Sequence, residues 1–143
     1  MTFVHAPDFV SLSEMPFLRS LTTQKRRPNL LVACTGPSVD GAVARLAAVC
    51  APPTRIYKLP GTVDLPACGG GTILLDDVSA LTRRQQLQLF DWMTVRPNVQ
   101  IVSVTQAPLL SFVQDGLFLE GLFYRLNTVC ILATGARIVE GRA

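Results

Sequence analysis

Residues 69–77 read GGGTILLDD, a short apolar run that follows three glycines and ends in two carboxylates. Such a run is typical of a strand covered on both faces, as in a parallel sheet. Ligands gather at the carboxyl ends of parallel strands, so Asp76 and Asp77 stand where a bound group would be met. Thr82 and Gln85 have the spacing of a capping box and predict that a helix follows. We interpret the three glycines as a structural lead-in to the strand.

The same alternation of strand and helix extends to both sides of this stretch. Residues 29–34 (NLLVAC) form a second apolar run, and Ala42, Leu46 and Cys50 then recur with helical spacing. Further strands are expected at 54–59, 99–105 and 128–132, and further helices at 13–27, 82–96, 108–116 and 119–126. Strands that alternate with amphipathic helices predict an α/β fold, a three-layer αβα sandwich with a parallel sheet.

Composition places the 143 residues in one globular domain spanning 1–143. Hydrophobic residues make up 49% and charged residues 16%, and mean hydropathy is +0.37, which excludes a disordered segment. Ten glycines and ten prolines argue against a coiled coil. No apolar run approaches the ~18 residues of a membrane span, and the start has no pattern of a secretory signal. We therefore expect a cytoplasmic protein with no membrane contact.

Cysteine and charge patterns exclude two further classes. The four cysteines, at 34, 50, 68 and 130, have neither metal-ligand nor redox spacing, and His5 is the one histidine. A zinc site is not expected, and buried reduced thiols in apolar runs favour the cytoplasm. Net charge is +3, and the one basic cluster, residues 25–27, is read as a solvated loop after a helix. Direct DNA binding is therefore not expected.

Three of the expected strands end in polar residues. These ends are residues 35–38 (TGPS), residues 76–77 (DD) and residues 103–106 (SVTQ). A phosphate-binding turn before a helix, a strand ending in a magnesium carboxylate and a polar sensor strand are the parts of a nucleotide triphosphatase. The layout predicts a P-loop topology.

Three motifs in order support a family resemblance. Residues 70–78 (GGTILLDDV), followed by QQLQ at 85–88, resemble the Walker B segment and next helix of the AAA+ domain in sigma-54-dependent transcriptional activators and response regulators. Residues 99–106 resemble the sensor I strand, and residues 115–127 (DGLFLEGLFYRLN) resemble the family's GxFRxDLxYRLN segment. The resemblance covers residues 15–132, most closely from 69 on. It implies a P-loop AAA+ core, here expected without the helical lid subdomain.

The phosphate loop departs from the family pattern. Aligning residues 43–45 (VAR) with the family's VAR places the loop at residues 34–41, where G-x-x-x-x-G-K-[ST] is expected. An aspartate, Asp40, takes the place of the lysine and sets a repulsive charge beside a triphosphate, which costs several kcal/mol. The four positions of that motif hold Cys34, Val39, Asp40 and Gly41, and the residues left to meet a phosphate are Gly36, Ser38, Asp40 and Gly41.

The hydrolytic residues that the resemblance implies are also altered. Asp77 replaces the water-activating glutamate, Gln106 replaces the sensor asparagine, and Leu119 replaces the first arginine finger, which leaves Arg125 as the second. We expect no catalytic residue; in an active domain Asp76, Asp77, Gln106 and Arg125 would fill that role, with Asp76 on magnesium. Residues 50–68 hold nothing like the GAFTGA loop that engages sigma-54.

The sequence therefore predicts a non-hydrolysing domain of transcription regulation that works by protein–protein contact. The expected partners are activator-type AAA+ subunits or other regulators, in a homo- or hetero-oligomer, and no cofactor is expected. One alternative is an active ATPase that binds ATP and magnesium through a non-standard phosphate contact. Another is a docking module inside a larger regulator. Magnesium-dependent phosphate release that is lost in Asp76→Asn would favour the ATPase.

Overall fold

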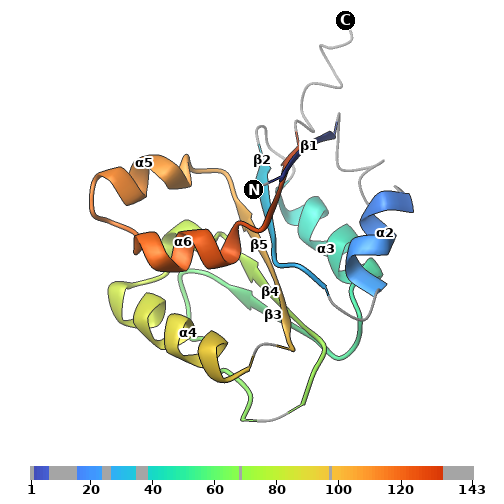
Figure 1. Cartoon of the computed structure of the whole chain (residues 1–143), viewed down its shortest axis with the longest axis horizontal. Coiled ribbons are helices and arrows are strands. Elements are labelled where there is room, and N and C mark those ends of the chain that lie inside the picture. The colour runs from blue at the N-terminus through green and yellow to red at the C-terminus, as the bar shows by residue number, and fades with distance from the viewer. Residues whose placement is uncertain are drawn as a thin grey trace, which may run out of the picture.

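The computed structural model describes residues 2–6, 16–23, 27–34, 39–67, 69–96 and 98–133 (Figure 1). The helices and strands follow one another along the chain as β1 (Thr2–Ala6), α2 (Pro16–Thr23), β2 (Leu30–Cys34), α3 (Val39–Val49), β3 (Thr54–Lys58), β4 (Thr72–Asp76), the 3₁₀ helix η1 (Val78–Ala80), α4 (Arg83–Val95), β5 (Gln100–Thr105), α5 (Leu109–Gln114), α6 (Glu120–Leu126) and β6 (Val129–Ala133).

The strands of these ranges form one six-stranded sheet in the order β1-β6-β2-β5-β4-β3, and every pairing is parallel. Because all strands run the same way, their carboxyl ends share one edge, and β2 lies between β6 and β5 at its centre. The central strands β2, β4 and β5 are buried almost throughout, which explains why their sequences are mostly apolar. The predicted parallel α/β sandwich is confirmed.

Helices cover both faces of the sheet (Figure 1). On one face the buried stripe of α3 packs against alternate residues of β2, β4, β5 and β6. On the other face α4, α5 and α6 close a second core over the remaining strand positions, with Phe118, Leu122, Phe123 and Leu126 buried as expected. The two apolar cores hold the carboxyl edge in place because β2, β4 and β5 each pack into both of them.

The helices and strands predicted from residue 29 onward match the structure to within about two residues at most ends. The capping box is present: Thr82 Oγ1 accepts from the Gln85 N–H at 3.1 Å, and Gln85 Oε1 accepts from the Thr82 N–H at 2.9 Å. One strand was not predicted, the edge strand β1, which pairs with β6. Among the described residues, no helix is long and apolar enough to cross a membrane.

Candidate functional site

The carboxyl edge brings together the ends of β2, β5 and β4, as the strand order requires. Asp76, the last residue of β4, is 7% exposed, and it lies near enough to Cys34 at the end of β2 to influence that thiol. Burial, with a further contribution from the Asp76 carboxylate, raises the pKa of Cys34 to about 12. The carboxylate expected to meet a magnesium ion therefore lies within electrostatic range of the strand that leads into the predicted phosphate loop.

Asp77 has a left-handed backbone, with φ 72° and ψ 64°. Its N–H donates to Val104 O at 2.9 Å, and its Oδ1 accepts from Ser79 Oγ at 2.8 Å. A left-handed non-glycine residue costs of order 1–2 kcal/mol, which these contacts offset. The two neighbouring carboxylates thus differ: Asp76 ends the strand in the core, and Asp77 turns the chain into η1.

The phosphate-loop positions are described in part. Gly36 and Ser38 lie outside the described residues, and of Asp40 the structure describes the backbone, in the first turn of α3. At Gly41 an added Cβ would meet Arg45 Nη1 at 3.5 Å, an ordinary contact with a flexible side chain. No close backbone approach therefore requires a glycine at position 41, and α3 offers no hydroxyl there.

Lysine is the charge that a phosphate loop needs, and Lys58 is the one lysine among the described residues. It ends β3 beside Asp76 of β4, is exposed, and lies three strands from β2. Three inter-strand spacings are about 14 Å, more than twice the reach of a lysine side chain. Lys58 therefore lies too far from the end of β2 to meet a phosphate bound at the predicted loop.

Arg125 lies near the amino ends of the strands, opposite the carboxyl edge that holds Asp76. Its backbone oxygen accepts from Asn29 Nδ2 at 2.9 Å, and Asn29 immediately precedes β2. Its guanidinium carbon lies 4.3 Å from the centre of the Phe90 ring, and Nη1 donates to Thr94 Oγ1 at 2.7 Å. The exposed guanidinium is thus held against α4 of its own chain by a cation–π contact and a hydrogen bond.

Gln106 and Leu119 complete the predicted positions. Gln106 directly follows β5 at the carboxyl edge, where it is exposed, next to the buried Thr105. Leu119 occupies the N-cap position of α6, makes no side-chain capping hydrogen bond and is half-buried. The structure therefore brings Asp76, Asp77 and Gln106 to one edge and leaves Arg125 at the other.

Sequence reasoning missed the role of Gln86, a polar residue on the buried side of α4. Its Nε2 donates to Leu81 O at 3.1 Å and to Leu117 O at 3.2 Å, and its Oε1 accepts from the Leu119 N–H at 2.9 Å. One amide thus joins α4 to the segment that leads into α6. The position of Gln86 in the QQLQ motif was the available signal, because a buried glutamine requires such partners.

Gly71 has a structural role. Its φ is +93°, and an added Cβ would overlap the Pro53 carbonyl oxygen and lie 2.8 Å from Pro53 Cδ. That same oxygen accepts from the Thr72 N–H at 2.9 Å, so the glycine lets β4 begin directly against the turn before β3. At Gly69 and Gly70 an added Cβ would meet nothing within 4 Å.

The described cysteines are buried free thiols at positions 34, 50 and 130. Burial raises the pKa of Cys50 to about 11 and that of Cys130 above its usual range. Cys68 lies outside the described residues. Within the described ranges, no three histidine, cysteine, aspartate or glutamate side chains gather to hold a metal.

Comparison with known proteins identifies the family. The model of the sigma-54 interaction domain matches residues 60–132, about half of the chain. The HTH-type transcriptional regulatory protein TyrR of Citrobacter braakii is 32% identical over 74 residues, covering 43% of this chain and 14% of the relative. The Nif-specific regulatory protein of Azotobacter vinelandii is 36% identical over 74 residues with the same coverage.

Solved structures support the fold. NtrX of Brucella abortus, solved in complex with ATP, superposes with a TM-score of 0.66 at 18% identity, covering 87% of this chain and 35% of that chain. The ADP complex of the same protein gives a TM-score of 0.68 and covers 92% of this chain. The chain spans a small part of the length of these relatives. With the family model matched across β4, α4, β5, α5 and α6, the chain belongs to the family of sigma-54 interaction domains.

Proposed function

We propose that this sigma-54 interaction domain acts in bacterial transcription regulation through protein–protein contact and does not hydrolyse ATP. The observation that carries the proposal is the distance between the predicted phosphate loop after β2 and the one lysine among the described residues. Asp76 ends β4, two strands from the end of β2, where a phosphate would be bound, and Lys58 ends β3, about 14 Å from β2 on the far edge strand. The chain's other lysine, Lys25, lies outside the described residues and outside the aligned loop.

The residues present do not fit ATP and magnesium in the usual mode. A triphosphate needs a lysine and a backbone cradle at the helix start, and the aligned positions hold Asp40 and Gly41. Two unit charges 4 Å apart interact by about 4 kcal/mol at moderate screening, so exchanging lysine for aspartate reverses a contribution of that size. We derive no chemical step through a nucleotide at this site.

Partner contact is the remaining role for a domain with these helices and motifs. The family segment at residues 115–127, which contains Arg125, is buried against the sheet through Leu122 and Leu126, so its shape is retained. The guanidinium of Arg125 packs on Phe90 and would have to leave that ring to reach a neighbouring subunit. We propose that the domain joins activator-type AAA+ subunits in the cytoplasm and contributes a surface without catalysis.

A phosphate-release assay tests the absence of hydrolysis. The purified chain is assayed with ATP and magnesium beside Asp76→Asn, which removes the candidate metal ligand. We expect both proteins to release phosphate at the same background rate. Magnesium-dependent release by the wild type that Asp76→Asn abolishes would overturn the proposal and favour the active ATPase, the candidate that the retained, buried Asp76 supports.

Analytical ultracentrifugation tests partner contact. The chain is mixed with a purified full-length activator, for which the Nif-specific regulatory protein of Azotobacter vinelandii is a suitable probe. We expect a co-sedimenting complex. The control variant Lys58→Ala should form the same complex, because β3 lies outside the segment of closest resemblance. This role would be contradicted if neither this nor any other full-length activator formed a complex, even at protein concentrations well above those at which the activator assembles into its own ring.

A further inference from the structure

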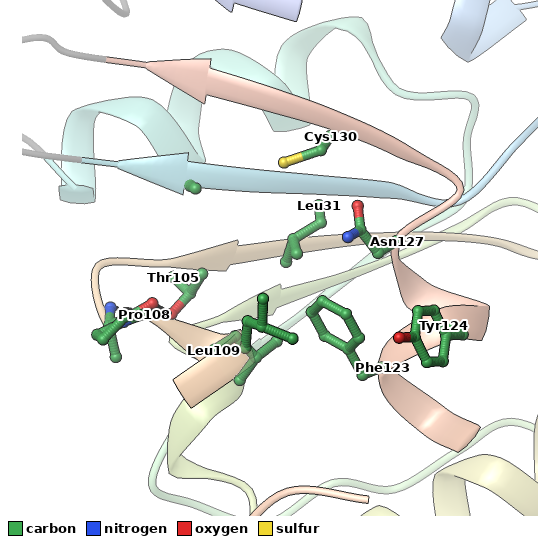
Figure 2. Close-up of a pocket in the computed structure, with 11 residues that line it drawn as sticks. Leu31, Thr105, Pro108, Leu109, Phe123, Tyr124, Asn127 and Cys130 are labelled. Atoms are coloured by element: carbon green, nitrogen blue, oxygen red, sulfur yellow. Dashed lines mark hydrogen bonds between the residues drawn. The ribbon is translucent and has the colours of Figure 1, made fainter. Parts of the chain in front are cut away.

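A pocket of about 290 Å³ opens between the two short helices α5 and α6 and the sheet (Figure 2). Leu31, Ala33 and Cys130 form its floor on β2 and β6, and Leu109 and Phe123 form its wall on the helices. In Figure 2 the side chain of Leu31 extends from the sheet towards Leu109 and Phe123. Neither Asp76 nor Asp77 lines this pocket, so it is separate from the candidate nucleotide site.

The pocket exists because short side chains meet on one face of the sheet. Ala33 and Thr105 are register partners on β2 and β5, and Leu31 and Cys130 are register partners on β2 and β6. Three of these four side chains are small. Tyr124 and Leu110, on α6 and α5, also line the pocket and remain 55% and 49% exposed.

The lining selects an uncharged ligand. None of the described residues that line the pocket carries a charge, so an anion or cation would lose its hydration without compensation. The hydroxyl of Thr105 already exchanges hydrogen bonds with the backbone of Ala107, at 3.0 and 3.2 Å. Asn127 supplies the one side-chain amide, and the rings of Phe123 and Tyr124 supply aromatic surface.

The volume selects the size of the ligand. A cavity of about 150 Å³ with apolar walls holds benzene, so about 290 Å³ suits two fused rings. Apolar walls with a few polar groups are the usual lining of small-molecule sites. We propose that this pocket binds an uncharged aromatic compound of one or two rings that carries a single hydrogen-bonding group. The binding is independent of the proposed function at the carboxyl edge.

Titration with indole tests the proposal. Methyl resonances of Leu31 and Leu109 are followed by NMR as indole is added, and saturable shifts with a dissociation constant of about 1 mM or below are expected. Indole-3-carboxylate, which adds a charge to the same rings, should bind at least ten-fold more weakly. Absence of saturable shifts at these methyls, or equal binding of the charged analogue, would overturn the proposal.

Variants locate the binding. Ala33→Leu fills the floor from a partly buried position and should weaken indole binding at least ten-fold while the melting temperature is kept. Leu110→Ala removes a rim contact and should weaken binding about three-fold, whereas Leu87→Ala on α4, also 49% exposed, should leave it unchanged. If Ala33→Leu does not fold, comparing the indole affinity of Leu110→Ala with that of Leu87→Ala still tests where the ligand binds. Equal affinity in Leu110→Ala and Leu87→Ala would refute this location.

Discussion

Gln86 provides the sharpest test of how this domain is held together. The side chain is 2% exposed and uses one amide to satisfy three backbone groups, the carbonyls of Leu81 and Leu117 and the N–H of Leu119. Leucine has a similar volume but no polar atom. Gln86→Leu therefore keeps the packing and leaves all three backbone groups without this partner.

The expected loss follows from the desolvation of those groups. Each buried polar group without a partner costs about 1–3 kcal/mol, and the loop around Leu117 is exposed enough for water to relieve part of the cost. We expect Gln86→Leu to lower the free energy of unfolding by about 3 kcal/mol. For a domain of this size that corresponds to a fall in Tm of about 10 °C.

Thermal and denaturant unfolding measure this loss. Gln88→Leu is the matched control, because the same substitution two residues along α4 falls on an exposed side chain and should change stability by less than about 0.5 kcal/mol. Hydrogen exchange gives a local readout, since the Leu119 amide should lose protection in Gln86→Leu alone. Equal stability of the two variants would refute the reasoning that this amide joins α4 to α6.

Three further predictions concern single positions. Gly71→Ala should lower stability by about 3 kcal/mol or more, because its Cβ would overlap backbone at positive φ, while Gly70→Ala should not; urea unfolding of both checks this. Asp77→Asn should stay within about 1 kcal/mol of wild type, while Asp77→Val should lose about 2 kcal/mol in the left-handed conformation; equal melting temperatures would contradict this. Burial holds the pKa of Cys34 near 12 and of Cys50 near 11, so above about pH 9 the unfolded chain loses thiol protons that the folded chain keeps. Stability should therefore fall between pH 9 and 11, by up to about 1.4 kcal/mol per pH unit for each thiol, and replacing both by alanine should flatten the slope in pH-dependent melts.

Most of the fold was predictable because its information is local. The runs at 29–34, 72–77 and 99–105 are mostly apolar and rich in leucine, isoleucine and valine, since their strands are covered on both faces, and each is followed by a helix with its own start signal. The strand β1 was missed because five residues at a sheet edge carry no periodicity of their own. Its pairing with β6, more than 120 residues away, supplies the order.

The sequence motifs name the candidate site residues, but they do not predict how those residues are arranged in space. Motif order assigns Asp76 to a strand end, and the sheet order then places that end two strands from β2, with β5 between them. The same motifs name Arg125, but its position over the Phe90 ring depends on how α6 packs on α4. The left-handed backbone of Asp77 and the aromatic pocket also arise from tertiary contacts, which no local pattern encodes.

The absence of a working phosphate loop is the central claim, and calorimetry with ATP and magnesium tests it most directly. Asp40→Lys, which restores the positive charge at the aligned position, is the informative comparison because any gain in binding reports on that site. We expect no measurable binding by the wild type at millimolar ATP. Micromolar binding by the wild type would show that the loop works without its lysine, and it would contradict the proposal that this domain does not use ATP.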